Sequence, residues 1–288
     1  MTGQNNSNKW NLRPFQDEVL KIFKVFDAIC KKYDLRYYAD GGTALGAIRH
    51  GGFIPWDDDF DVDVPRNDFN KLIEILPKEL PPHMRLRRGG ETKHSPIHFF
   101  KIIDEREGIM DDLSKRTNLE VDIEPFIDVF ALDGIPTQVT ELTKWWRGRR
   151  MLRMCQLYRY PNSAMASGGK WALKNVLARF AGFFISWFVS KTANNEEMMR
   201  LVDRYAMRWA YDESKMVVEP AFFRMRTRYI FPKEMFEGVR ELPFEDTTIR
   251  VPYKLEDYLT RFFNDYMQLP PEDCRVPEHL FKRAWNHV

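Results

Sequence analysis

The sequence Trp56-Asp57-Asp58-Asp59-Phe60-Asp61-Val62-Asp63-Val64 alternates aspartates with apolar side chains. Successive side chains of an extended strand point to opposite faces, so Asp57, Asp59, Asp61 and Asp63 are predicted to share one face. The opposite face would carry Asp58 and three apolar side chains that suit a core. Carboxylates on one face of a strand repel one another unless a cation lies among them. The stretch therefore predicts a strand whose acidic face binds a metal ion.

The predicted ion is Mg²⁺, with Mn²⁺ as the alternative. Hard divalent cations take oxygen ligands and keep open positions for phosphate groups, so a site with several carboxylates indicates phosphate chemistry. The other interpretation of the stretch is a solvated acidic loop, because aspartate is depleted in strands. The regular alternation of the apolar partners, and the glycine pair that precedes the stretch, favour the metal site.

That glycine pair follows Asp40, in the sequence Gly41-Gly42-Thr43. Adjacent glycines permit positive φ angles and a close approach of the backbone to a ligand. Amide groups there, or at the N-terminus of a helix beginning near Thr43, are suited to hold an anion. Gly-Gly-Thr alone is equally an ordinary turn. Because the aspartate stretch follows it, we interpret it as a phosphate-binding turn.

Composition describes a soluble globular protein. The 288 residues carry a net charge of +2, with 44% hydrophobic and 30% charged residues. The three cysteines are far apart and lack zinc-ligand spacing, so they are predicted to be reduced and mostly buried, as in a cytoplasmic protein. The first residues are polar and lack the apolar core of a signal peptide. No run reaches the roughly 18 apolar residues of a membrane span.

Hydrophobic periodicity predicts a mixed α/β fold. Helices are expected over 14–33, 66–76 (closed by Pro77) and 255–267, and strands over 35–39, 98–103 and 121–132. The predicted organisation is a disordered tail (1–13), a catalytic core (14–137), a basic helical region (138–217) and a C-terminal segment that completes the catalytic domain (218–288).

Asp128 is the predicted third metal ligand. It shares a strand face with Phe126, Phe130 and Leu132, and a lone carboxylate among large apolar side chains is costly unless it is paired or bound to metal. The alternative is a capped or salt-bridged aspartate at a strand end. Asp122 is the nearest rival, but its acidic neighbours indicate a solvated face.

Charge is concentrated in the middle of the chain, where residues 144–191 hold ten basic residues and no acidic ones. The later part of this region is apolar and aromatic at helical spacing, which suits an anionic membrane surface or an anionic acceptor. The alternative is a helical subdomain that packs this face inward. No helix-turn-helix or ribonucleoprotein motif supports nucleic-acid binding. The alternating residues Arg224, Arg226 and Arg228 would share one face of a strand and suit phosphate binding. The alternative is that they are surface charges.

The residues from Gly41 to His50, followed by those from Gly52 to Asp61, resemble the signature of the LicD-type phosphotransferases, relatives of fukutin and fukutin-related protein. The similarity continues through Phe100-Lys101-Ile102, through residues 127–134, and to Pro270-Pro271 near the C-terminus. The chain departs from the family pattern at Phe263-Asn264, where Tyr-Gly is common, and at Ala131, where proline is usual. These two positions bear on donor and acceptor preference.

The resemblance implies a polymerase-β-like nucleotidyltransferase core with a helical, basic insertion. By position, Asp59 and Asp61 match the paired metal aspartates, Asp57 a further acidic ligand, and Asp128 the separate third carboxylate. The predicted donor-binding set matches the glycine turn and the basic positions near the donor phosphates: Gly41, Gly42, Thr43, Arg49, His50 and Lys101.

The resemblance also implies an activity: Mg²⁺-dependent transfer of a phospho-alcohol, phosphocholine first of all, from a CDP-activated donor to a hydroxyl of a cell-surface glycan precursor, with release of CMP. The acceptor would be a glycan or lipid-linked glycan, reached from the cytoplasm or the inner face of the membrane, and Asp57 is a candidate base. The alternatives are transfer of glycerol phosphate or ribitol phosphate, a nucleotidyltransferase that releases pyrophosphate, and a glycan-binding protein with a relic site.

Overall fold

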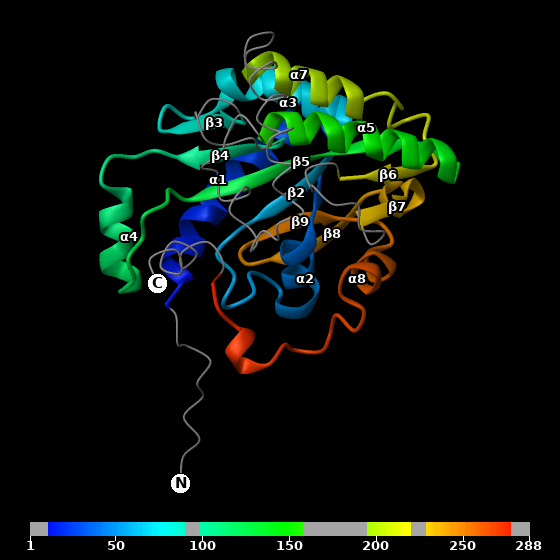
Figure 1. Cartoon of the computed structure of the whole chain (residues 1–288). Helices are drawn as coiled ribbons and strands as arrows, with labels where there is room; N and C mark the ends of the chain where they lie inside the picture. Colours follow the sequence, from blue (N-terminus) through cyan, green and yellow to red (C-terminus); the bar gives the residue numbers. More distant parts are fainter. Residues whose placement is uncertain (1–10, 90–97, 158–194, 220–228, 278–288) are drawn as a thin grey trace, which may run out of the picture. The chain divides into compact units, whose positions relative to one another are not determined.

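The computed structural model describes residues 11–89, 98–157, 195–219 and 229–277 (Figure 1). It is mixed α/β, as predicted. The chain divides into two compact units, and each is described by itself. The first comprises Met1–Leu86, Lys101–Phe130 and Lys233–Val288, and the second comprises Arg87–Phe100 and Ala131–Pro232.

The first unit is built on a sheet whose neighbouring strands run in the order β1-β2-β5-β4-β3. Their bounds are Tyr38–Ala39 (β1), Asp61–Pro65 (β2), Met84–Arg88 (β3), Phe100–Asp104 (β4) and Phe126–Ile135 (β5). β1 and β2 are antiparallel, with Tyr38 opposite Asp63. The amide of Asp128 donates to the carbonyl of Phe60 at 2.8 Å. The acidic stretch and the strand of Asp128 are therefore neighbours.

Helices and a hairpin complete the first unit. They are α1 (Arg13–Lys32), α2 (Gly41–His50), α3 (Arg66–Glu79), α4 (Ile109–Thr117), α8 (Leu255–Phe263), the 3₁₀ turns η2 (Lys233–Phe236) and η3 (Glu272–Cys274), and the antiparallel hairpin of β8 (Arg240–Phe244) and β9 (Thr247–Val251). α1 forms because its apolar side chains recur at helical spacing, and Phe15, Ile22 and Phe26 on this face are fully buried.

An aromatic cluster fills the core beneath the acidic stretch. The ring of Phe60 lies 4.7 Å from Phe23, 5.8 Å from Phe53 and 5.5 Å from Phe244, measured between centroids. Phe60, Val62 and Val64 are all fully buried, which confirms the predicted apolar face. Because Phe60 stands between Asp59 and Asp61, packing of its ring fixes the backbone that carries both carboxylates.

α2 approaches the loop that follows it so closely that only glycine fits at position 46. A Cβ on Gly46 would lie 2.4 Å from the carbonyl oxygen of Gly52, well inside van der Waals contact. The close approach brings α2 against the loop that leads into the acidic stretch.

Five local expectations were wrong. The helix predicted over 255–267 ends at Phe263. The acidic stretch is a strand only from Asp61 to Pro65, and residues 57–60 are irregular. α3 continues through Pro77 to Glu79; Pro77 lies in the last turn of the helix, where it cannot donate a hydrogen bond to the carbonyl of residue 73. β1 is only two residues long, and the region predicted as strand over 121–125 precedes β5.

The second unit contains α5 (Val139–Leu157), α7 (Asn195–Ala206) and the antiparallel strands β6 (Met216–Val218) and β7 (Ile230–Pro232). β5 enters this unit at Ala131, and there it pairs with β6. Its core joins the end of β5 to α5, α7, β6 and β7 through the buried residues Ile135, Trp145, Ala206, Val218 and Ile230.

The basic region begins in α5, and part of it faces the core of the second unit. Arg149 and Arg153, one helical turn apart, are each 1% exposed, whereas Arg147 and Arg150 are exposed. Burial lowers the pKa of Arg149 to about 9; the charge of Arg153 acts in the same direction, and Asp133 opposes it. These two arginines pack inward, but the apolar and aromatic face that the inward-packing interpretation concerns lies later in the region and is not tested by them. Residues 158–194, and Arg224, Arg226 and Arg228, lie outside the described residues.

Two further expectations concern the cysteines and the chain ends. Cys30 is buried and Cys274 is exposed, so the prediction of mostly buried cysteines fails at Cys274. The predicted tail overlaps ordered structure: Leu12 is 1% exposed, and Asn11 donates to the carbonyl of Arg116 at 3.0 Å. Within the described ranges, no helix combines the length and apolar character needed to cross a membrane.

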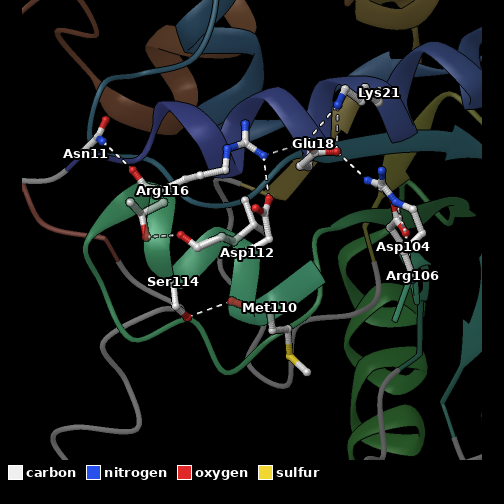
Figure 2. A network of polar contacts seen from close by, with 11 residues as sticks. Asn11, Glu18, Lys21, Asp104, Arg106, Met110, Asp112, Ser114 and Arg116 are labelled. Carbon is white, nitrogen blue, oxygen red and sulfur yellow. Dashed lines mark hydrogen bonds and ion pairs between the residues drawn. The ribbon is translucent and has the colours of Figure 1, made fainter. Parts of the chain in front are cut away.

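A polar network joins α1 to α4 and to the end of β4 (Figure 2). Its centre is Glu18, whose side chain is 5% exposed. The Glu18 carboxylate accepts from Lys21 at 2.9 Å, from Arg106 at 2.5 Å and from Arg116 at 3.2 Å. Arg106 also pairs with Asp104 and Arg116 with Asp112, so the network holds the loop between β4 and α4 against α1.

Glu18→Gln is expected to lower the free energy of unfolding at neutral pH by about 1–2 kcal/mol, discounted because the cationic partners are partly solvated. Burial alone would raise the pKa of the Glu18 carboxyl, but hydrogen bonds from Lys21, Arg106 and Arg116 outweigh it and lower that pKa below the usual 4.5. This contribution is complete above about pH 4.5 and is lost as pH falls through the folded-state pKa.

Thermal unfolding between pH 3 and pH 7 checks this prediction, with the exposed Glu107→Gln as the matched control. The melting temperatures of wild type and Glu18→Gln should converge at the acid end of the range. A gap between them that stays constant with pH would contradict the assignment.

Candidate functional site

The first turn of α2 is fixed by a tyrosine from the far end of the chain. The hydroxyl of Tyr258, on α8, donates to the carboxylate of Asp40 and accepts from the amide of Gly41 at 3.1 Å. Figure 1 shows α2 (blue) beside α8 (orange). Burial raises the pKa of Asp40 to about 6; its hydrogen bonds oppose this, and the charge of Asp59 adds to it.

The acidic loop is held in place from α1. Gln16 is buried, and its amide nitrogen donates to the carbonyl of Ile54 at 3.1 Å and to the carbonyl of Asp57 at 2.8 Å. These bonds satisfy carbonyl groups that a strand would otherwise pair. The hydrogen bonds from Gln16 thus hold the irregular segment before Asp61 in one conformation.

A pocket of about 630 Å³ opens beside this loop. Asp57, Asp59 and Asp61 line it, together with Gly42 and Arg49 from α2. The opposite wall comes from the chain after α8, including Phe263, Tyr266 and Pro270. The structure therefore gathers three of the four predicted carboxylates and two of the predicted donor-binding residues around one cavity.

Gly42 allows the acidic loop to approach α2. A Cβ at this position would lie 2.7 Å from Oδ2 of Asp57, so any other residue would push the carboxylate away. Gly42 lies in the first turn of α2, where backbone amides have no intrahelical partner. A carboxylate and the start of a helix thus meet at the glycine, and a ligand entering the pocket meets both.

The carboxylates of the site repel one another. Burial raises the pKa of Asp61 well above its usual value, and the charges of Asp59, Asp128, Asp40 and Asp57 raise it further. Oxygen donors under mutual repulsion suit a hard divalent cation, which would relieve that repulsion. As placed, however, the described side chains include no cluster of three or more His, Cys, Asp or Glu that is ready to hold a metal ion.

Asp128 lies outside the lining of the pocket and pairs with Lys101. Both carboxylate oxygens of Asp128 accept from Nζ of Lys101, at 2.6 and 2.8 Å. The same ammonium lies 3.5 Å from the centre of the Phe126 ring. The salt-bridged alternative for Asp128 is thus what the structure shows, while its charge still acts on Asp61. Lys101 stands next to the acidic group, as a cation that neutralises it.

Three of the predicted residues, Thr43, His50 and Asp63, do not line the pocket. The Thr43 hydroxyl is buried and accepts from the amide of Asp61 at 2.9 Å, so it joins α2 to β2. The His50 ring lies edge-on to Trp56, 6.2 Å between centroids, outside the pocket lining; burial and the charge of Arg49 lower its pKa. Asp63 was predicted to share the acidic face, but it is 1% exposed and does not line the pocket.

Sequence reasoning missed the wall that follows α8. Nη1 of Arg49 donates to the carbonyl of Tyr266 at 3.0 Å, which ties α2 to this wall. It also missed Asp40 and Tyr258. One signal was present: Asp is a favoured residue at a helix N-cap, and Asp40 directly precedes the glycine pair. No local pattern links Tyr258 to residues more than 200 positions away.

The family model for the LicD/FKTN/FKRP nucleotidyltransferase domain matches residues 34–172, which include the glycine turn, the acidic loop and Asp128. The chain belongs to the LicD/FKTN/FKRP family. It is 26% identical over 275 residues to the lipopolysaccharide cholinephosphotransferase LicD of Haemophilus influenzae, an alignment that covers 94% of this chain and 97% of the relative.

Another member of the family shares a shorter part of the chain. The ribitol 5-phosphate transferase FKRP of Homo sapiens is 30% identical over 108 residues, which is 38% of this chain and 19% of that protein. The mouse protein matches to the same extent. Membership in the family is thus supported by one alignment along almost the whole chain and by a shorter one.

Proposed function

We propose that this chain transfers a phospho-alcohol, with phosphocholine as the first candidate, from a CDP-activated donor to a hydroxyl of a cell-surface glycan precursor, and releases CMP. The observation that carries the proposal is the pocket in which Asp57, Asp59 and Asp61 meet Gly42 and Arg49. The alignment with the cholinephosphotransferase, which covers nearly the full length of both chains, supports phosphocholine.

In this reaction the acceptor hydroxyl attacks the phosphorus of the phospho-alcohol. A new phosphodiester P–O bond forms, the P–O bond to CMP breaks, and the hydroxyl proton passes to a carboxylate, for which Asp57 is the candidate. Asp59, Asp61 and Asp128 would hold Mg²⁺ (or Mn²⁺), which supplies charge stabilisation to the diphosphate. Arg49 is placed to neutralise phosphate oxygens, and Lys101 beside Asp128 adds positive charge. Phosphoryl transfer needs little more than such positioning and charge stabilisation.

The proposal extends to the fold of the catalytic core, which is its first part, and to the place in the cell where the protein works, which is its second part. We propose a nucleotidyltransferase-like core, interrupted by a basic helical insertion, that works in the cytoplasm and binds an anionic membrane peripherally. The description of the matching family model supports the first part. Arg147 and Arg150 are exposed on α5 and are available for the second part, whereas the buried Arg149 is not.

A second donor is favoured by a specific observation. The segment shared with FKRP, a ribitol 5-phosphate transferase, is 30% identical over 108 residues. Ribitol phosphate or glycerol phosphate would leave the transfer chemistry unchanged, since only the alcohol differs. The two donors are told apart by the product.

³¹P NMR of the purified protein tests the proposal. The donors are CDP-choline, CDP-ribitol, CDP-glycerol and CTP, each with Mg²⁺ and a crude cell-surface glycan fraction as acceptor. A new phosphodiester signal with CMP identifies the donor. Pyrophosphate released from CTP would instead indicate a nucleotidyltransferase, and no product from any donor would count against the transferase.

Removal of divalent cations is expected to abolish CMP release. Burial and then repulsion from the other carboxylates raise the pKa of Asp61, and with EDTA in excess no cation offsets that repulsion. The donor phosphates would then lie against three carboxylates with no cation between them. Activity should return when Mg²⁺ or Mn²⁺ is added beyond the chelator. A rate that is the same in EDTA would contradict the assigned role of the carboxylates.

A further inference from the structure

The chain after α8 returns across the pocket as a segment, residues 264–276, that has little regular structure of its own. α8 ends where Asn264 adopts a φ of 61°, and between that residue and Val276 the short η3 turn is the only helical element. Asp265 to Leu269 are largely exposed, yet Tyr266, Gln268 and Leu269 line the pocket. What fixes this segment therefore matters for the pocket.

Two arginines hold the segment 264–276 in place. Arg49 reaches it from α2 through the hydrogen bond to the Tyr266 carbonyl at 3.0 Å. Arg275 belongs to the segment itself: its Nε donates to the carbonyl of Pro270 at 2.9 Å, and its guanidinium lies 5.4 Å from the centre of the Trp56 ring. Cys274 and Val276, on either side of Arg275, line the pocket; Arg275 itself does not, but the Trp56 ring that its guanidinium contacts does.

The two guanidiniums are close enough to act on each other. Burial lowers the pKa of Arg49, the charge of Arg275 lowers it further, and Asp57 opposes both. Like charges held together at a pocket are unfavourable until an anion neutralises them. Among the described residues, Arg275 makes its side-chain hydrogen bond through Nε, which leaves both terminal nitrogens for a ligand. A guanidinium presents these nitrogens in the fork geometry that phosphate accepts.

We propose that Arg275 binds the diphosphate of the donor together with Arg49, at the pocket that the carboxylates of the acidic loop line. The inference rests on the proposed function and extends it, because it gives the C-terminal segment a direct part in donor binding. Arg275 keeps its Nε bond to Pro270 and turns its two terminal nitrogens from the face of Trp56 toward the phosphates. The donor diphosphate is then held by two guanidiniums, one from α2 and one from the segment 264–276.

Isothermal titration with CDP in Mg²⁺ buffer tests the inference. Arg275→Gln is expected to lower the affinity for CDP about tenfold or more, the loss typical of a charge-assisted contact. Arg275→Lys should recover part of this loss, because it keeps the charge without the fork. Arg261→Gln, which removes an exposed arginine from α8, is the matched control and should bind CDP as wild type does.

Cytidine separates phosphate binding from pocket shape. It enters the same pocket without a phosphate, so Arg275→Gln should leave its affinity unchanged. Equal losses for cytidine and CDP, or no loss for CDP, would overturn the inference. Alkylation of Cys274, followed by peptide mass spectrometry, gives a second readout: CDP should protect this thiol in wild type and fail to do so in Arg275→Gln.

Inorganic pyrophosphate keeps the two proposals distinguishable. If wild type binds pyrophosphate in an Arg275-dependent way but no CDP-alcohol is consumed in the NMR assay, the diphosphate site stands and the donor assignment falls. If CDP-choline is turned over equally well by Arg275→Gln and by wild type, the transferase stands and the role of Arg275 falls. Binding of neither CDP nor pyrophosphate by wild type counts against both.

Discussion

Asp59→Asn and Asp61→Asn are each expected to lower the rate of transfer roughly a thousandfold or more while the protein stays folded. Both carboxylates line the pocket. Burial raises the pKa of Asp61 most, and among the neighbouring charges that of Asp59 raises it most. An amide of the same shape removes a charged oxygen donor without opening a cavity. The loss should therefore appear in kcat, measured as CMP release.

Asp61→Asn is expected to leave thermal stability unchanged or to raise it, although it lowers activity. Because Asp61 is half-buried among like charges, Asp61→Asn relieves repulsion and should unfold in EDTA at a temperature equal to or above that of wild type. Asp246→Asn, at an exposed aspartate that pairs with Lys24, is the matched control and should keep full activity. Near-normal turnover in both site variants would remove these residues from the chemistry.

Phe60→Ala is expected to lower the free energy of unfolding by about 3–5 kcal/mol, the largest stability effect predicted for this chain. The ring is fully buried and packs against Phe23, Phe53 and Phe244. Its loss would leave a cavity directly under the two carboxylates that flank it in the chain. Denaturant titration, followed by tryptophan fluorescence, measures the effect.

Phe60→Leu is the control, because it keeps most of the volume and should cost much less. The alanine variant should also lose activity under conditions in which it remains folded, since the backbone of Asp59 and Asp61 is no longer fixed. A fully active, destabilised Phe60→Ala would show that the core and the acidic loop are independent.

The long elements of the fold could be predicted from the sequence because periodicity is a local signal. α1 was predicted within a residue at each end, and the burial of Phe60, Val62 and Val64 followed from their alternation with aspartates. The prediction that Pro77 closes α3 was wrong, because the proline lies inside the last turn and the helix ends two residues later, at Glu79. The short β1 and the irregular loop before Asp61 depend on partners such as Gln16 that no local pattern reveals.

The residues of the candidate site that belong to one local sequence pattern could be predicted, whereas those brought in from distant segments could not. Asp57, Asp59 and Asp61 meet at one pocket although residues 57–60 are not a strand, because a loop beside Gly42 brings them there. Asp63 shares a face with Asp61 within β2, but it is buried and does not line the pocket, which spacing alone does not reveal. Asp40, Tyr258 and Arg275 enter through tertiary contacts between distant segments, which spacing alone does not encode.

The hydrogen bond from Tyr258 to Asp40 spans 218 positions in the chain, and the bond from Arg49 to Tyr266 spans 217. A ribosome releases residues 40–61 long before it has joined the amino acids of α8 and the segment behind it. The nascent polypeptide therefore carries an acidic loop that lacks its opposite wall for most of the time it is being translated. Assembly of the complete pocket lining therefore has to wait until translation has passed residue 276.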